Sequence, residues 1–473
     1  MLFNSIPFFL FFPIVFVIYY LLPGRFRWSM LLLASVAFYM YASVQTVFVP
    51  IVITICSFAC GVLVEKNAQN NKGKFYYVIG IILNLGLLLF YKYINFILGN
   101  ICGFIKYFNN TSPFVLNYAM PIGISYITFQ AVGYLTEIRK GNQHAEKNMG
   151  HFAAYIFFFP KLLSGPIERA HNFLPQLHGE SEICYENVAD GAKRFLLGLL
   201  KKLVVADRLA IYTNAVLGNA EHHKGATLAI ASLFYTVQLY ADFSGYTDMA
   251  LGIAKMLGFK MAENFELPFF AKTMTEFWRR WHMSLTSWIT DYIYNPLVFK
   301  LRKLEKYGVM LTSVLTLTVI GLWHGANWTF IIFGLLHGLM ISVELLLRKS
   351  RRKFGKKYPR LESYLGMLFV FVFFTFTLVF FKAESVNQAF IVLKGIVHFK
   401  GPVFYESLSV MMLNCVVGAL FIVSEIKKGF YKESFSFFNN KSSAIRCFSY
   451  VSVCIIILLF GVFDGGQYIY FQF

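Results

Sequence analysis

The chain has 473 residues, of which 57% are hydrophobic, 19% are aromatic and only 14% are charged. A typical soluble domain has roughly 25% charged residues, so this chain cannot cover a water-facing surface. The 43 Lys and Arg against 24 Asp and Glu give a formal net charge of +19, which suits either nucleic acid or an anionic membrane face. The mean hydropathy of +0.58 decides for the membrane and against nucleic acid.

Long apolar stretches recur along the whole chain. A transmembrane helix needs roughly 20 mostly apolar residues. This criterion selects the stretches 5–22, 28–42, 45–64, 75–98, 113–137, 227–253, 309–346, 364–381, 403–424 and 445–463. The stretch 309–346 is too long for one crossing and is interrupted at His324-Gly325-Ala326-Asn327, so we predict two segments or one bent helix. Shorter pieces at 149–163, 189–205 and 274–298 mix apolar runs with charge, Pro and Gly, which is typical of re-entrant or interfacial helices.

These patterns predict an all-α polytopic integral membrane protein, with about 10 to 12 transmembrane helices and the re-entrant pieces around a central tunnel. We expect one membrane-embedded domain over residues 1–473, with a catalytic core at 115–345. The run 5–22 has no basic region before it and no small-residue cleavage site after it, so we expect a retained first helix rather than a signal peptide.

Lys and Arg gather in short loops at alternate ends of successive spans. They occur at 25–27, 66–74 and 139–147, and eight lie between 348 and 360. Short cytoplasmic loops are rich in Lys and Arg, so we predict that these four loops are cytoplasmic and that the N-terminus is outside. The expected location is the bacterial cytoplasmic membrane, with the lipid bilayer as the first partner.

Polar residues inside the apolar region gather in the middle of the chain, where a charge near the bilayer centre costs at least about 2.5 kcal/mol. Helical spacing places Gln238, Asp242, Gly245 and Gly252 on one face, and Ser244 and Asp248 on a neighbouring face. The structural alternative is that the two acids pair with nearby cations and lock helices together. The candidate cations are Lys255, Arg279 and Arg280.

Two histidines follow a tryptophan: His282 after Trp281 and His324 after Trp323. His324 comes after fifteen residues without any charge, which places it deep in the membrane domain. An imidazole exchanges a proton near neutral pH, and an apolar wall keeps it neutral as a base. A single buried histidine is most often a satisfied core residue. A second one in the same context, 42 residues earlier, favours a functional pair.

Other candidate sites are weaker. On a continuous helix, thirteen residues would carry His337 roughly 20 Å along the axis from His324 and more than half a turn round, so we expect a structural role for His337. His282 and His324 lack a third ligand at a recognisable spacing, so we predict no metal. The seven cysteines are scattered without a CxxC motif and read as core residues.

Several motifs, in order along nearly the whole chain, resemble those of the membrane-bound O-acyltransferases, in particular the membrane subunits of alginate O-acetyltransferases. The central motifs are Tyr240 to Met249, Glu263-Asn264-Phe265, Glu276 to Ser284, and Leu322-Trp323-His324-Gly325-Ala326. The outer motifs are Met1 to Ser5, Lys92-Tyr93, Asn95-Phe96, Pro121 to Ser125, Thr128-Phe129-Gln130, Pro160, Gly165-Pro166-Ile167, and Tyr468 to Phe473.

The resemblance implies that His324 is the catalytic histidine and that His282 lines the same tunnel. We expect His324 to be the general base toward an acceptor hydroxyl, or to carry the acyl group briefly. His282 would orient the group or hydrogen-bond the developing oxyanion. The expected tunnel-lining residues are Trp281, Trp323, Asn327, Gln238, Tyr240, Asp242, Ser244 and Asp248. The donor would be a cytoplasmic acyl thioester, acetyl-CoA, acting as a substrate, and no cofactor is expected.

The expected acceptor is an extracytoplasmic polysaccharide such as alginate or another surface glycan, reached directly or through a partner acetyltransferase outside the membrane. The same chemistry would serve D-alanyl transfer to teichoic acid or O-acetylation of peptidoglycan, and the motifs do not separate these. A transporter or flippase would also carry acids, histidines and broken helices in the membrane. Such proteins often show two halves with matching interruptions, whereas these motifs crowd into 238–328.

Overall fold

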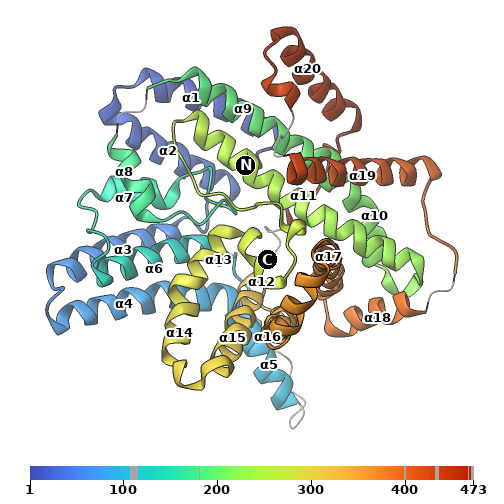
Figure 1. The fold of residues 1–473 in the computed structure, drawn as a ribbon. Coiled ribbons are helices and arrows are strands. Elements are labelled where there is room, and N and C mark those ends of the chain that lie inside the picture. The colour runs from blue at the N-terminus through green and yellow to red at the C-terminus, as the bar shows by residue number, and fades with distance from the viewer. Residues whose placement is uncertain (107–114, 180–181, 399–400, 432–435, 467, 470–473) are drawn as a thin grey trace. The chain divides into compact units, whose positions relative to one another are not determined.

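The computed structural model describes residues 1–106, 115–179, 182–398, 401–431, 436–466 and 468–469 (Figure 1). Within these residues the chain is helical, and the only strand-like pairing is an isolated bridge between Phe265 and Trp281. The predicted all-α class is therefore confirmed. The chain divides into two compact units, Met1–Ala192 with Ala250–Ala262, and Lys193–Met249 with Glu263–Phe473. The expectation of a single domain over 1–473 stays a prediction.

The helices up to residue 199 are α1 (Ile6–Leu21), α2 (Gly24–Ala42), α3 (Phe48–Lys66), α4 (Asn71–Leu88), the π-helical η1 (Leu89–Tyr93), α5 (Ile94–Lys106), α6 (Ile124–Lys140), α7 (Met149–Phe157), α8 (Ala170–His178) and α9 (Tyr185–Leu199). Within the first unit, α3 packs against α4, α6 and α7.

The following helices are η2 (Leu200–Ala206), α10 (Asp207–Leu217), η3 (Ala220–His222), α11 (Ala226–Met256), η4 (Pro268–Phe270), α12 (Met274–Arg280), α13 (Met283–Ile289), η5 (Thr290–Tyr294), α14 (Asn295–Lys300), η6 (Arg302–Leu304), α15 (Glu305–His324), α16 (Trp328–Lys357), α17 (Pro359–Lys382), α18 (Val386–Val397), α19 (Leu408–Tyr431), η7 (Ser436–Asn439) and α20 (Ser443–Phe460). The predicted interfacial piece 274–298 is thus a series of short helices.

Seven helical segments in the described part of the chain are long and apolar enough to cross a membrane. They are Phe48–Lys66, Asn71–Cys102, Arg302–His324, Trp328–Lys357, Pro359–Lys382, Leu408–Gly429 and Ser443–Phe460. The helices Ile6–Leu21 and Val386–Val397 are apolar but shorter. The protein is therefore a multi-pass membrane protein, and the total of about 10 to 12 crossings stays a prediction.

The predicted transmembrane span 113–137 starts before the helix that the structure has there. The stretch 113–137 was expected to be helical throughout, but α6 begins only at Ile124, and 113–114 lie outside the described residues. Gly123 has a left-handed backbone with φ of 70°, and a Cβ there would lie 2.3 Å from the carbonyl oxygen of Leu162. The chain therefore needs glycine at this turn, and the apolar residues before it do not continue the helix.

The long stretch 309–346 forms two helices, α15 and α16, as the interruption predicted. Gly325 is extended, and the side chain of Asn327 accepts a hydrogen bond of 3.0 Å from the Thr329 amide, which caps the start of α16. The two helices then pack closely along each other. A Cβ on Gly334 would lie 2.2 Å from the carbonyl oxygen of Leu317, so small residues permit this close approach.

Candidate functional site

His282 lies in the junction between α12 and α13, in a conformation that few residues other than glycine adopt. Its φ of 44° and ψ of 54° are left-handed, and its side chain is fully buried. Strained backbone of this kind costs about 1–3 kcal/mol and persists only where the surrounding structure holds it. The strain at His282 therefore marks a position where the orientation of the imidazole is imposed.

Asn264 holds this imidazole. Its side-chain oxygen lies 3.1 Å from His282 Nδ1 and also accepts hydrogen bonds from the Ser284 amide and hydroxyl, at 3.2 and 2.6 Å. Because that oxygen can only accept, Nδ1 of a neutral His282 carries the proton and Nε2 carries the lone pair. Burial lowers the pKa of His282 to about 3, so the ring is neutral at cellular pH.

His324 is the last residue of α15 and is 4% exposed. Aromatic rings surround it. Its ring centroid lies 5.1 Å from that of Trp323, 5.2 Å from that of Phe381 and 6.3 Å from that of Phe333. The position at the break between α15 and α16 places a proton-exchanging group inside an apolar shell.

The indole of Trp323 contacts both histidines. Its ring centroid lies 5.9 Å from that of His282 and 5.1 Å from that of His324. The tertiary structure thus brings two imidazoles that are 42 residues apart in sequence around a single tryptophan. Phe243 of α11 packs edge-on against His282 at 4.8 Å. Phe243 and Asn264 both stand in motifs named above, but neither was predicted to contact His282.

His337 makes the contacts of a structural histidine. Its Nδ1 accepts a hydrogen bond of 3.3 Å from Trp278 Nε1, and its Nε2 lies 3.0 Å from the Thr377 hydroxyl. Both ring nitrogens therefore have partners in the protein. The side chain ties α16 to α12 and α17.

The two acids of α11 form ion pairs, but not with the predicted cations. Asp242 pairs with Lys202 at 2.8 Å, and its second oxygen accepts from the Ile469 amide at 2.9 Å. Asp248 pairs with Lys201 at 2.7 Å and with Arg194 at 2.9 Å. These cations come from α9 and η2.

The predicted partners Lys255 and Arg280 are engaged elsewhere, with Asp190 and Glu276, each at 2.8 Å. Arg279 lines a pocket along α15 and α16. The structural alternative of the sequence analysis was therefore right about ion pairing and wrong about the partners, because α9 and η2 pack beside α11. A Cβ at Gly198 would lie 2.6 Å from the Gly245 carbonyl oxygen, which shows how closely the backbones approach.

Three of the remaining tunnel-lining candidates lie on α11, and Asn327 lies at the start of α16. Gln238 accepts a hydrogen bond of 2.5 Å from Thr213 of α10, so it faces the same way as Asp242. Tyr240 donates to Glu425 at 2.6 Å and packs against Trp281, with ring centroids 5.9 Å apart. Ser244 is buried. Asn327 caps α16 and also donates to the Glu384 carbonyl at 2.9 Å.

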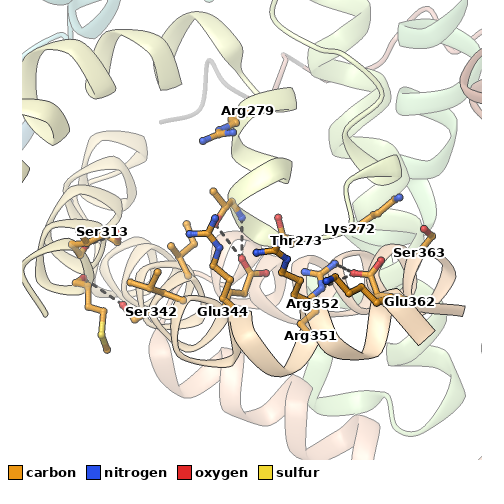
Figure 2. A pocket seen from close by; sticks show the side chains of 18 of the residues that line it. Lys272, Thr273, Arg279, Ser313, Ser342, Glu344, Arg351, Arg352, Glu362 and Ser363 are labelled. Carbon is orange, nitrogen blue, oxygen red and sulfur yellow. Dashed lines mark hydrogen bonds and ion pairs between the residues drawn. The ribbon is translucent and has the colours of Figure 1, made fainter. Parts of the chain in front are cut away.

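A basic pocket of about 840 Å³ lies along the first half of α15 and the second half of α16, away from the break at His324 (Figure 2). Its cationic lining residues are Lys272, Arg279, Arg348, Arg351, Arg352 and Lys356. Glu344 and Glu362 are engaged within it, Glu344 by the Met274 amide at 2.6 Å and Glu362 by Arg351. Ser313, which lines the pocket, precedes His324 by eleven residues, or about 16 Å along α15. The pocket is suited to a ligand with several negative charges.

Comparison with known proteins gives a family and several relatives. The family described as "MBOAT, membrane-bound O-acyltransferase family" matches residues 148–383. "Probable alginate O-acetylase AlgI" of Azotobacter vinelandii is 34% identical over 392 residues, which cover 82% of this chain and 76% of the relative. "Peptidoglycan O-acetyltransferase" of Helicobacter pylori is 32% identical over 435 residues, which cover 85% of this chain and 80% of the relative. "Teichoic acid D-alanyltransferase" of Bacillus subtilis is 31% identical over 276 residues, which cover 56% of this chain and 70% of the relative.

Proposed function

Because the chain belongs to the membrane-bound O-acyltransferase family and is an acyltransferase of the multi-pass membrane type, we propose that it acetylates a polysaccharide outside the bacterial cytoplasmic membrane. The acetyl group comes from a cytoplasmic thioester and passes through the membrane at His324. The observation that carries this proposal is the placement of His282 and His324 around the indole of Trp323.

In the proposed mechanism His324 takes the proton of the acceptor hydroxyl as that oxygen attacks the thioester carbonyl. The carbon–sulfur bond breaks, and the thiolate leaves with a proton returned from the imidazole. A neutral imidazole within hydrogen-bond reach is sufficient for this role. His282, whose orientation Asn264 imposes, donates its Nδ1 proton to Asn264 and carries a lone pair on Nε2. In this state Nε2 can accept a hydrogen bond from the attacking hydroxyl and position it, but it cannot donate one to the developing oxyanion.

We propose acetyl-CoA as the donor, and the basic pocket supports this choice. Coenzyme A carries several phosphate charges, and Arg side chains bind phosphate oxygens through two parallel hydrogen bonds. Arg348, Arg351 and Arg352 line the pocket and belong to the segment that the distribution of charge predicts to be cytoplasmic. The thioester would reach from the pocket toward His324 along α15.

The acceptor follows from what the relatives are named for. Two of them are named for O-acetylation, of alginate and of peptidoglycan, and these align over more of this chain than the teichoic acid D-alanyltransferase does. We therefore propose a surface glycan hydroxyl as the final acceptor, with a partner acetyltransferase outside the membrane as an intermediate carrier. D-alanyl transfer is the competing acyl group for the same site.

The test uses the purified full-length protein with radiolabelled acetyl-CoA, or with a D-alanyl thioester, and an added glycan or partner. The expected result is slow hydrolysis or transfer of the acetyl label, which His324→Ala lowers by about 10²- to 10⁴-fold, the usual contribution of a general base. His337→Ala is the matched control and should have a much milder effect. An intact thioester in the presence of acceptor, with movement of an unmodified substrate across vesicles, would favour a transporter and overturn the proposal.

A further inference from the structure

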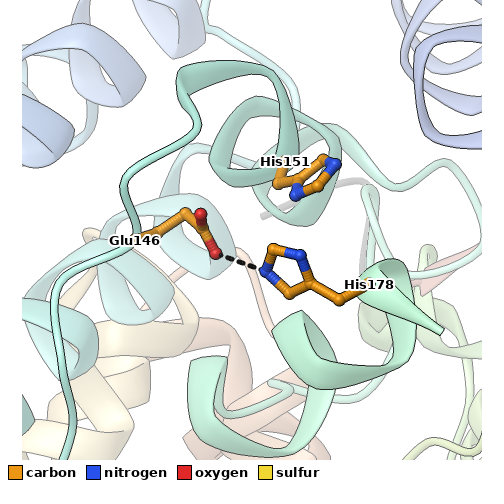
Figure 3. Close-up of side chains that lie close together, drawn as sticks. All are labelled: Glu146, His151 and His178. Carbon is orange, nitrogen blue, oxygen red and sulfur yellow. Dashed lines mark hydrogen bonds and ion pairs between the residues drawn. The ribbon is translucent and has the colours of Figure 1, made fainter. Parts of the chain in front are cut away.

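Three potential metal ligands gather in the first unit of the chain (Figure 3). Glu146 lies in the loop between α6 and α7, His151 is in the first turn of α7, and His178 is the last residue of α8. One ligand atom from each lies within 4.8 Å of the others. This cluster is separate from His282 and His324, which belong to the second unit.

The Glu146 carboxylate is fixed in place. Its Oε1 accepts hydrogen bonds of 2.9 Å from the amides of Lys147 and Asn148, and its Oε2 lies 2.9 Å from His178 Nε2. The side chain of Glu146 is 8% exposed, whereas that of His178 is 50% exposed. The cluster therefore has one buried, oriented carboxylate oxygen and one side that opens to solvent.

His151 is the member of the cluster with a buried ring nitrogen that no hydrogen bond satisfies in the described part of the chain. The residue is 9% exposed, and its buried Nδ1 has no hydrogen-bond partner in the part of the chain that the structure describes. Its ring packs edge-on against Trp28, with ring centroids 5.1 Å apart, and against His178 at 4.4 Å. Leaving a buried polar atom without a partner is destabilising, so a ligand at this nitrogen would remove a penalty as well as form a bond.

We propose that Glu146, His151 and His178 bind a zinc ion. Two imidazoles and one carboxylate form a donor set that suits Zn²⁺, with nitrogen and oxygen ligands at about 2.0–2.2 Å from the metal and a water molecule in the fourth position. Ligand atoms around such an ion are roughly 3–3.5 Å apart. Small side-chain rotations would bring the three ligand atoms from their present spacing to that distance. The ion would replace the hydrogen bond between Glu146 and His178 and use Nδ1 of His151.

The site would act as a clamp within the first unit. It would join the end of α8 to the loop after α6 and the start of α7; along the chain, α7 and α8 are connected by the turn-rich residues 158–169. Because Lys140 and Lys147 flank the loop, the charge distribution predicts that the ion would be taken from the cytoplasm. Binding would require neutral imidazoles and an ionised carboxylate, and it would release any proton held between Glu146 and His178.

The experiment measures metal binding by the full-length protein in detergent, purified without a polyhistidine tag and stripped with a chelator. Zn²⁺ is titrated calorimetrically, and Co²⁺ is used as a probe because its visible absorption reports tetrahedral coordination. The expected result is one Zn²⁺ per chain and a tetrahedral Co²⁺ spectrum that Zn²⁺ abolishes. Loss of a residue that only hydrogen-bonds to a metal ligand weakens metal binding by roughly 10- to 100-fold. We expect at least this loss of Zn²⁺ affinity when a ligand itself is replaced, in Glu146→Gln, His151→Ala or His178→Ala.

His171→Ala is the matched control, because His171 is an exposed histidine on the same helix as His178, and it should leave Zn²⁺ binding unchanged. Glu146→Gln keeps the size of the side chain, and gel filtration with metal-free thermal stability verifies that each variant is folded. Unchanged Zn²⁺ affinity in folded His151→Ala and His178→Ala would overturn the proposal. So would the absence of a tetrahedral Co²⁺ spectrum in the unsubstituted protein. Neither result would bear on the acyltransferase proposal, whose assay depends on His324.

Discussion

At His282, one asparagine decides which ring nitrogen can react. Asn264 accepts from His282 Nδ1 and from the Ser284 amide and hydroxyl, so one amide oxygen orients the whole turn between α12 and α13. The left-handed backbone of His282 is maintained by these contacts and by the bond of 2.9 Å from the Met283 amide to the Asn264 carbonyl. The chemistry of His282 therefore depends on a residue eighteen positions earlier.

We predict that Asn264→Ala lowers acyl transfer by about 5- to 150-fold, equivalent to the 1–3 kcal/mol cost of leaving a buried donor unsatisfied. Asn264→Asp keeps an acceptor at the same position and should retain much more activity than Asn264→Ala. Ser284→Ala is the control, because it removes one hydroxyl from Asn264 and leaves the contact with His282 intact. Equal activity of the Ala and Asp variants at Asn264 would contradict a positioning role.

The two histidines should also behave as one unit. Residues that act in the same step have non-additive effects, so the double His282→Ala, His324→Ala variant should be hardly less active than His324→Ala alone. The measurement is a double-mutant cycle on the rate of acetyl transfer from acetyl-CoA. If the two losses multiply independently, the histidines do not share a site and the contact of both with Trp323 is only packing.

At the scale of elements, the pair α15 and α16 connects the basic pocket with His324. The pocket lies along one half of the pair (Figure 2), and the break at His324 to Asn327 ends the other half. Gly321, Gly334 and Gly338 lie where the helices meet, and a Cβ on any of them would come within 2.6 Å of an atom of the other helix. Close packing of these two helices is thus a condition for placing His324.

We predict that Gly334→Leu prevents this packing and abolishes both the yield of folded protein and acyl transfer, because backbone atoms cannot move aside as a flexible side chain can. Gly86→Leu is the matched control in another apolar helix, where a Cβ would meet nothing within 4 Å. The readouts are the monodisperse fraction after gel filtration and the acetyl-transfer rate. Normal folding of Gly334→Leu would show that the two helices can separate without consequence.

At the scale of the whole molecule, the excess of positive charge predicts how the chain is oriented in the membrane. The net charge of +19 is concentrated in loops that the distribution of Lys and Arg places in the cytoplasm, and the segment 348–360 is the richest of them. The same segment supplies Arg348, Arg351, Arg352 and Lys356 to the pocket. Orientation and donor binding would therefore depend on one set of residues.

Cysteine labelling tests this orientation. In a cysteine-free background, Phe354→Cys should be protected from a membrane-impermeant thiol reagent in intact cells and labelled after lysis. Val44→Cys, in the loop between α2 and α3, is predicted to lie outside and should be labelled in intact cells. Both side chains are exposed in the structure, at 39% and 61%. The reverse pattern would place the basic pocket outside and make a cytoplasmic donor impossible there.

Sequence by itself determined the helical class, most of the helix positions, the break at 324–327 and the family, because length, hydropathy and motifs are properties of contiguous residues. It failed at 113–137, where one glycine turn overrode an apolar run. The closing motif reaches 470–473, which lie outside the described residues.

Only the tertiary structure decided which side chains meet. It paired Asp242 with Lys202, set Asn264 against His282, and placed Trp323 between two histidines. It also brought His178 to His151, 27 residues away, where the sequence analysis expected no metal. Such partners come from different helices, and their distances depend on how the helices pack, which no local pattern of residues specifies.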